Sequence, residues 1–158
     1  MTTAQETALN RPGPRENPRE SLAFGQFQVF WGDTLRITDD GFELDIRIPW
    51  YRSLPLSSVQ TLEVTVDGQR IAPEAVRFQL YGERLALDEL PNLFTTWWFI
   101  LDPATLHVAY DRPLQAGEKH TVELGLGFKI PYMMIGPNAF VQLNQVKKTL
   151  TAVEEAAA

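Results

Sequence analysis

Hydrophobic and polar residues alternate along most of the chain from residue 26 onward. In the run 42–48 every second residue is Phe, Leu or Ile, and the residues between them are charged. A period of two is the pattern of a β-strand with one buried face. Asp40-Gly41 and Asp67-Gly68 lie between such runs, where Asp-Gly predicts a hairpin turn. The other runs that we expect to be strands are 35–38, 61–66, 69–72, 76–80, 97–101, 106–110 and 121–130.

The C-terminal segment carries two patterns at once. Its large hydrophobic residues from Phe140 to Val153 have helical spacing, whereas Lys148–Thr151 has the alternation and composition of a strand. We favour the strand, followed by a short acidic and alanine-rich tail. About eight short strands, with turns roughly every 8–12 residues, predict an all-β fold that is an antiparallel β-sandwich or an open barrel.

The first 22 residues differ from the rest in composition. Pro12, Pro14 and Pro18 are interspersed with arginine and glutamate, which is typical of an extended or disordered segment. A length of 158 residues favours one domain. We therefore expect an extended N-terminal arm (1–22), a single β-sandwich domain (23–153) and a tail (154–158).

Two of the predicted strands lead into segments that combine proline with aromatic residues. These segments are Ile46-Arg-Ile-Pro-Trp-Tyr-Arg-Ser-Leu-Pro-Leu56 and Lys129-Ile-Pro-Tyr-Met133. Proline fixes φ at about −65° and lacks a backbone donor, so that a strand in mid-sheet cannot continue through it. Trp, Tyr and Arg are enriched at the energetic centres of interfaces. We expect two corners that present an interaction surface, made of Pro49, Trp50, Tyr51, Arg52, Pro131, Tyr132 and Met133.

Charge and cysteine content narrow the classes of partner and chemistry. The net charge of −6 argues against nucleic acid or an anionic membrane surface as the main partner. The chain has no cysteine, which excludes disulfides, thiolate catalysis and Cys-ligated metals. The N-terminus lacks the pattern of a signal peptide, and no apolar run approaches the roughly 20 residues of a membrane span. A cytoplasmic protein is the expectation.

The polar residues form no recognisable catalytic motif. The two histidines, His107 and His120, are not spaced as metal ligands, and we interpret them as surface residues. None of the serines lies in a nucleophile motif, and the carboxylates fall in turns or on the solvent side of strands. We therefore predict no catalytic residue, no metal site and no cofactor in this chain.

A pair of adjacent tryptophans suggests a second aromatic surface. Trp97 and Trp98 lie on a predicted strand and must point to opposite faces. Both faces are then large and apolar, so that the face turned away from the core needs a loop, a partner or a ligand to cover it.

The first corner also carries a family resemblance. The segment Ile46–Leu56, followed by Leu62–Gly68 and Val76-Arg-Phe78, resembles the small β subunit of bacterial C-glycoside deglycosidases. The Ile130-Pro-Tyr132 corner and the closing Lys147–Thr151 resemble it as well. The resemblance covers roughly residues 27–152, with a looser match from Gly82 to Thr96, and the N-terminal arm lies outside it.

The resemblance implies a hetero-oligomer in which this chain is the non-catalytic subunit of a carbon–carbon lyase. The partner α subunit is expected to be a sugar-isomerase-like barrel that carries a divalent metal, manganese by expectation, and the acid–base residues. The implied substrate is a 3-oxo-glycoside joined to a flavonoid-like aglycone by a carbon–carbon bond. The keto group acidifies the neighbouring C2 hydrogen, a metal can stabilise the enolate, and β-elimination then expels the aglycone.

Two other interpretations remain open at the level of sequence. Trp50 and Tyr51 can simply close one end of the fold instead of contacting a partner. The chain can also be a carbohydrate-binding or scaffold module without an enzymatic partner, with Trp97 or Trp98 as a stacking platform for sugars.

Overall fold

The structure, a computed structural model, describes residues 28–154. Within these residues nine strands form one sheet in the order β5-β4-β10-β11-β1-β2-β9-β6-β7, and β3 pairs with β8 alone. The predicted arm (1–22) and all but the first residue of the tail lie outside the described residues. The elements are β1 (Thr34–Thr38), β2 (Gly41–Ile46), β3 (Leu54–Pro55), η1 (Leu56–Ser58), β4 (Val59–Val66), β5 (Gln69–Arg70), η2 (Pro73–Ala75), β6 (Val76–Leu80), β7 (Glu83–Ala86), η3 (Leu87–Asn92), β8 (Trp97–Trp98), β9 (Ala104–Ala109), β10 (Lys119–Ile135) and β11 (Asn138–Glu154).

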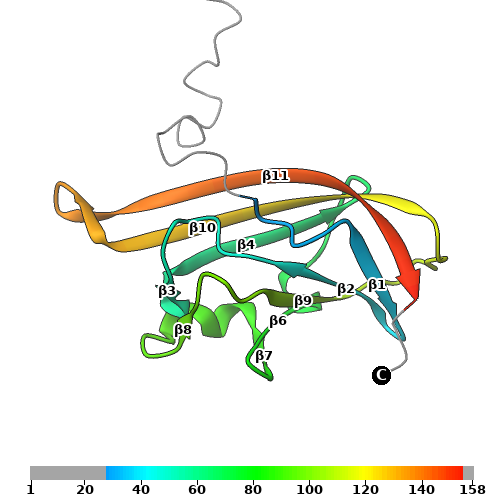
Figure 1. The fold of residues 1–158 in the computed structure, drawn as a ribbon, viewed down its shortest axis with the longest axis horizontal. Coiled ribbons are helices and arrows are strands. Elements are labelled where there is room, and N and C mark those ends of the chain that lie inside the picture. Colours follow the sequence, from blue (N-terminus) through cyan, green and yellow to red (C-terminus); the bar gives the residue numbers. More distant parts are fainter. Residues whose placement is uncertain (1–27, 155–158) are drawn as a thin grey trace, which may run out of the picture.

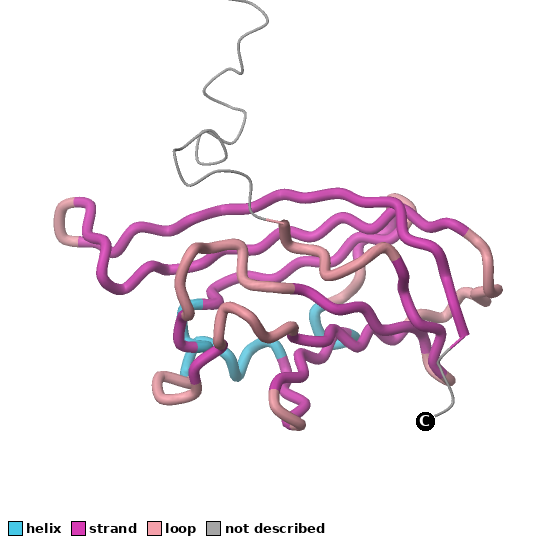
Figure 2. Tube along the Cα trace, in the orientation of Figure 1, coloured by secondary structure: helices cyan, strands magenta, loops and turns pink. Residues whose placement is uncertain are grey.

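The nine-stranded sheet curls into an open half-barrel (Figure 1). The all-β prediction is therefore confirmed, and the open barrel is the form that the sheet takes. Figure 2 shows that the short helical turns lie on the side toward which the sheet curls. The alternating residues of the strands fill the concave face, where Phe42, Phe78, Phe128 and Trp98 are fully buried.

The hairpin turns follow the sequence with one shift. Asp67 and Gly68 have φ values of +48° and +83° and join β4 to β5, as the Asp-Gly signal predicts. The β1–β2 hairpin is also present, but its turn is Asp39-Asp40, because Gly41 already pairs with Thr38. Gly41 serves a different purpose, since a Cβ there would lie 1.9 Å from the carbonyl oxygen of Val108 on β9. Only glycine allows this close approach of the two strands.

The second proline segment is a bulge and not a corner. β10 runs through Pro131, and its register against β11 passes from Ile130↔Phe140 directly to Met134↔Ala139. Residues 131–133 of β10 therefore have no paired residue on β11. β4 pairs with β10 only as far as Phe128, so that Pro131 lies beyond the part of the strand that has two neighbours. A proline without a backbone donor is tolerated at such a site, and the prediction that the strand ends in a corner there is wrong.

The remaining strand predictions differ in extent. The C-terminal segment is the strand that the composition favoured, and β11 forms a long hairpin with β10 that extends past the rest of the sheet at one end (Figure 1). The predicted strand 97–101 is limited to β8, because the chain turns after Trp98. The sheet is also not wholly antiparallel, since β1 and β11 pair in parallel, from Thr34↔Thr151 onward.

Candidate functional site

The two proline-aromatic segments meet in space although they lie eighty residues apart in sequence. Trp50 follows β2 in the first segment, and its indole Nε1 donates a hydrogen bond of 2.6 Å to the hydroxyl oxygen of Tyr132 in the β10 bulge. The guanidinium carbon of Arg52 lies 4.6 Å from the centre of the Tyr132 ring, a cation–π contact. The structure therefore joins the predicted residues of both segments into one site.

Burial divides these residues into two groups. Pro49 and Trp50 are buried, Trp50 with 1% of its surface exposed, and the Trp50 ring packs against Tyr51 and Phe140 with centroid distances of 5.0 and 6.4 Å. Tyr51, Arg52, Pro131 and Tyr132 are exposed, and Met133 is half-buried. The expectation that Pro49 and Trp50 belong to the outer surface is thus corrected. They close the end of the fold and hold the outer residues in place.

We call the exposed group Tyr51, Arg52 and Tyr132 the aromatic corner. Burial and the hydrogen bond with Tyr51 raise the pKa of the Tyr132 hydroxyl, against the opposing effects of the Trp50 hydrogen bond and the Arg52 charge. The phenol therefore stays neutral at physiological pH, and Arg52 supplies the positive charge of this surface. A cation beside two tyrosine rings is a composition suited to recognising another protein.

The adjacent tryptophans behave as their alternation predicts. Trp98 is 1% exposed and packs against Phe78 and Phe128, while Trp97 is 47% exposed. The Trp98 indole also donates a hydrogen bond of 2.7 Å to the carbonyl oxygen of Asp102. Trp98 is thus a core residue and is removed from the predicted second surface. Trp97 stays on that surface together with Phe99, the next residue of the same alternation, and with Phe94 and Leu101, which sequence reasoning did not single out. We call residues 94–101 the aromatic loop.

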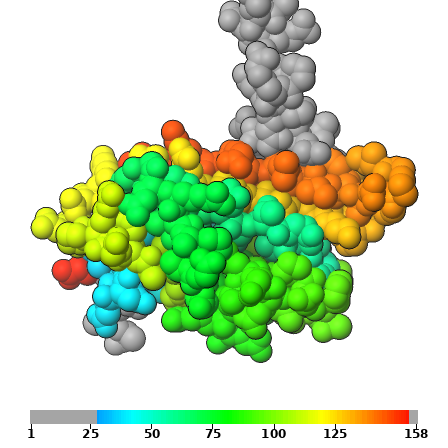
Figure 3. Space-filling view, turned by 180° about the vertical axis from the view of Figure 1, so that it is seen from behind, coloured from blue at the N-terminus to red at the C-terminus, as the bar shows by residue number. Residues whose placement is uncertain are grey.

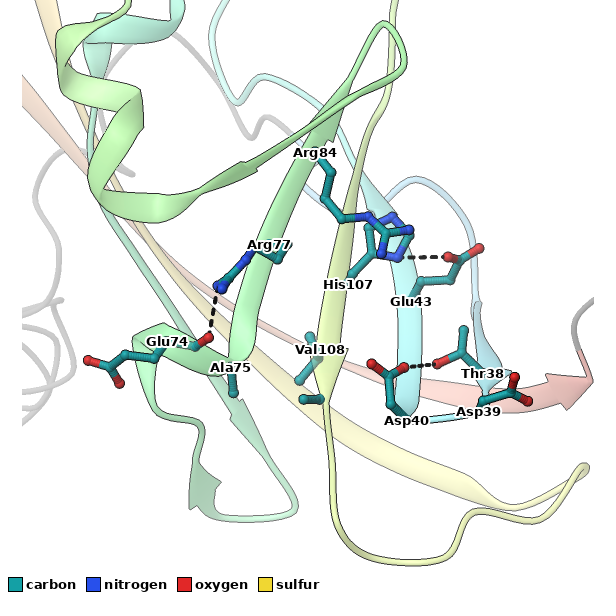
Figure 4. A pocket seen from close by; sticks show the side chains of 11 residues that line it. Thr38, Asp39, Asp40, Glu43, Glu74, Ala75, Arg77, Arg84, His107 and Val108 are labelled. Carbon is teal, nitrogen blue, oxygen red and sulfur yellow. Dashed lines mark hydrogen bonds and ion pairs between the residues drawn. The ribbon is translucent and has the colours of Figure 1, made fainter.

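A polar cavity of about 400 Å³ lies elsewhere, on the outer side of β2, β9, β6 and β7 (Figure 4). His107 is one of its lining residues, with Nδ1 3.0 Å from a Glu43 oxygen and Nε2 2.6 Å from the Gln79 side-chain oxygen. Arg36 in turn pairs with Glu43 and with Asp45. Burial and the nearby Arg84 charge lower the pKa of His107, against the effect of Glu43. This network ties neighbouring strands together across the outer face of the sheet.

The second histidine is also held by a carboxylate. His120 at the start of β10 has Nδ1 2.6 Å from an Asp67 oxygen, and Asp67 also accepts a hydrogen bond from the backbone of Thr121. Both histidine side chains are mostly shielded from solvent, with 17% and 12% exposed, so that the interpretation as surface residues is wrong. Each histidine is held by a carboxylate from a neighbouring segment, and His107 also lines the polar cavity.

Among residues 28–154, no three His, Cys, Asp or Glu side chains group closely enough to hold a metal ion. Within the same residues, the structure contains no helix that is long and apolar enough to span a membrane.

Comparison with known proteins gives consistent matches. The family model described as "C-glycoside deglycosidase beta subunit" matches residues 34–132. A C-glycoside deglycosidase beta subunit of Arthrobacter globiformis is 36% identical over 72% of this chain and 86% of its own length. One from Microbacterium trichothecenolyticum is 34% identical over 76% of this chain and 91% of its own length. A 3'-dehydrocarminate deglycosidase beta subunit of Microbacterium sp is 36% identical, covering 76% and 93%.

Proposed function

Since this chain belongs to the family of C-glycoside deglycosidase beta subunits, we propose that it is the non-catalytic subunit of a heteromeric enzyme that cleaves the carbon–carbon bond between a sugar and its aglycone. In this proposal the substrate is a 3-oxo-C-glycoside of the flavonoid type, and the enzyme is a cytoplasmic lyase that acts by β-elimination. The partner α subunit is a sugar-isomerase-like barrel. It holds the divalent metal, manganese by expectation, and the acid and base.

The meeting of the two proline-aromatic segments is the observation that carries the proposal of a docking subunit. The indole N–H of Trp50 donates a hydrogen bond to Tyr132 and so fixes the position of a residue from a distant part of the chain. The result is an exposed tyrosine–arginine–tyrosine group on a buried support. Residues held in one conformation lose little entropy when they bind, which favours use of the aromatic corner as a contact with the α subunit.

The arrangement of the titratable groups supports placing the chemistry on the partner. His107 is held between Glu43 and Gln79, and His120 is held by Asp67. A general acid or base has to reach a substrate proton within hydrogen-bond distance. The two imidazoles of this chain are engaged in holding strands together, and we assign the acid, the base and the metal to the α subunit.

The test is co-expression of this chain with candidate barrel-type α subunits. We expect the two polypeptides to co-purify, and we expect cleavage of a 3-oxo-C-glycoside only when both are present. The mass of the purified species gives the stoichiometry. Turnover by this chain alone would contradict a non-catalytic role, and failure of every candidate partner to bind would contradict the subunit role.

The aromatic corner is tested with the double substitution Tyr51→Ala/Arg52→Ala. We expect it to weaken assembly by roughly tenfold or more, because aromatic and arginine side chains dominate interface energies. Arg70→Ala is the matched control, since Arg70 is an exposed arginine on β5 that pairs only with Glu63 among the ion pairs of the described residues. Equal affinity of the double variant and the control would show that the corner is not the contact.

The carbohydrate-binding alternative has one observation in its favour, the half-exposed Trp97 ring. Its test is glycan binding by the isolated chain, measured by calorimetry with and without Trp97→Ala. Binding that disappears in the variant would support a sugar-binding module in place of the docking subunit.

A further inference from the structure

Most of the exposed large hydrophobic residues of the described chain gather at one end of the molecule. The aromatic loop contributes Phe94, Trp97, Phe99 and Leu101, and the end of the β10–β11 hairpin contributes Met134 and Ile135 beside Tyr132. Figure 1 shows β3, β8 and the hairpin end on the same side of the fold. From behind, Figure 3 shows the orange hairpin above and the green segment that contains the loop below, with blue-green residues between them.

The aromatic loop is held in one conformation despite its short strand. Trp98 anchors it in the core, where it contacts Phe78 and Phe128. On the surface, the Tyr81 hydroxyl accepts a hydrogen bond of 3.1 Å from the Phe99 amide and donates one of 2.7 Å to Asp102. A segment anchored at several points presents its apolar side chains at a low cost in conformational entropy.

The loop is also continuous with the aromatic corner. β8 pairs with β3, which places Trp97 opposite Pro55 and Trp98 opposite Leu54. The Ile100 amide donates a hydrogen bond of 2.8 Å to the side-chain oxygen of Ser53, the residue that follows Arg52. The Leu56 amide donates another, of 2.8 Å, to the carbonyl oxygen of Thr96. The corner and the loop therefore form one connected surface, and a partner that covers the corner reaches the loop as well.

The apolar area at this end exceeds what a monomer normally exposes. The four loop side chains are 47% to 75% exposed. At about 200 Å² for a large side chain, this corresponds to roughly 500 Å² of apolar surface. Tyr51, Tyr132, Met134 and Ile135 add roughly 400 Å² by the same reckoning. The largest apolar patch of a typical monomer is about 300–600 Å², while a standard interface takes about 800 Å² from each partner.

We propose that the aromatic loop is a second arm of the docking surface, and that the catalytic α subunit is seated between this loop and the end of the β10–β11 hairpin. This inference rests on the proposed function, which supplies the partner. It goes beyond that function by assigning a role to Phe94, Trp97, Phe99 and Leu101, none of which lies in a proline segment. Continuity with the corner favours the α subunit over a second copy of this chain or a sugar.

The test uses Phe94→Gln/Leu101→Gln in the complex with the α subunit. These two side chains are the most exposed of the loop, at 70% and 75%, so that the fold tolerates their replacement. We expect the dissociation constant of the complex to rise about tenfold or more, with the melting temperature of the isolated chain unchanged. Trp31→Gln is the matched control, an exposed aromatic residue that precedes β1 and stacks on Arg47. It should leave assembly unaffected.

Hydrogen exchange gives a second measurement that does not depend on a substitution. We expect the amides of residues 94–101 and 132–136 to become protected together when the wild-type complex forms. Protection of the hairpin end alone would overturn the two-arm proposal.

Several outcomes separate this proposal from the proposed function. A loop variant that assembles normally while Tyr51→Ala/Arg52→Ala does not would refute the second arm and leave the subunit role intact. Normal assembly with a raised KM for the 3-oxo-C-glycoside would assign the loop to the substrate and overturn docking. Dimers of the isolated chain that the loop variant abolishes would assign the loop to a second copy. If the wild-type chain binds no α subunit, the proposed function itself fails.

Discussion

The two adjacent tryptophans offer the sharpest stability test, because they have the same chemistry and opposite surroundings. Replacing Trp98 with alanine removes a ring that is 1% exposed and lies between Phe78 and Phe128. A buried tryptophan covers about 250 Å², or about 6 kcal/mol at 25 cal/mol per Å² as an upper bound. Measured Trp→Ala changes in cores cost about 3–5 kcal/mol. We expect Trp98→Ala to lower the free energy of unfolding by about 4 kcal/mol.

Trp97→Ala should cost far less. Its ring is already 47% exposed, and water fills the space that the ring leaves, so that no cavity forms. We expect a loss of about 1 kcal/mol. Trp98→Phe is the intermediate case, because it keeps an aromatic ring but loses the donor to the Asp102 carbonyl, for a cost of about 2 kcal/mol.

Urea unfolding of the isolated chain, followed by circular dichroism, measures all three variants on one scale. If Trp98→Ala does not fold at all, Trp98→Phe and Trp97→Ala still rank the two positions. A Trp97→Ala loss equal to or larger than the Trp98→Ala loss would refute the assignment of one ring to the core and the other to the surface.

Three further changes test other parts of the fold. Gly41→Ala should cost about 3 kcal/mol or more in urea unfolding, because its Cβ would overlap the Val108 carbonyl, whereas Gly82→Ala, in open space at a φ of +82°, should cost about 1–2 kcal/mol. Hydrogen bonds from His120 and Thr121 outweigh burial and lower the pKa of Asp67 below 3.8. Its carboxylate therefore stabilises the fold above that pH, and the stability difference between wild type and Asp67→Asn should shrink as the pH falls below it. Because the pKa of His107 is lowered in the folded state, the unfolded chain binds more protons than the folded chain below about pH 6.5. Wild-type stability should therefore decrease as the pH is lowered through that range. His107→Gln should remove this contribution to the pH dependence of stability.

The all-β class and several strands could be predicted because alternation reports directly on which face of a strand is buried. The run 42–48 shows this well, since Phe42, Leu44, Ile46 and Ile48 are all buried. The Asp67-Gly68 turn was visible for a local reason, because both residues need the left-handed backbone that Asp and Gly tolerate. The Tyr81-Gly82 turn has the same conformation but was not predicted, since tyrosine carries no turn signal.

Features that depend on pairing between distant strands were out of reach. The parallel contact of β1 with β11 follows from how the sheet closes, and no local pattern marks it. Pro131 predicts a break in the strand, because proline removes a ladder donor. Whether that loss matters depends on the neighbours, and the register shift between Ile130 and Met134 removes the need for the donor. The sequence of β10 does not show where its pairing with β4 ends, and that position decides whether Pro131 has to donate a hydrogen bond.

The candidate site was predicted in part, and the missing part has a physical cause. Proline and tryptophan drew attention to residues 46–56, and Trp50 does lie at the meeting point of the two segments. The aromatic loop was found only through Trp97, because Phe94 and Leu101 on their own match the composition of a core. A sequence shows that a residue is apolar but not whether its own chain covers it.

The difference between support and contact decides how substitutions at this site have to be interpreted. Trp50 is 1% exposed, and its indole N–H donates a hydrogen bond to Tyr132. Its ring packs against the rings of Tyr51 and Phe140. Its replacement by alanine would cost about 3–5 kcal/mol of stability whether or not a partner binds nearby. Loss of assembly in that variant would therefore say nothing about the interface. Tyr51, Arg52, Phe94 and Leu101 are exposed, so that their replacement changes mainly the surface. Tyr51→Ala also removes the ring that packs on Trp50, so that stability has to be measured beside assembly in that variant. Only a loss of assembly at unchanged stability, at both the corner and the loop, would identify this end of the molecule as the docking surface.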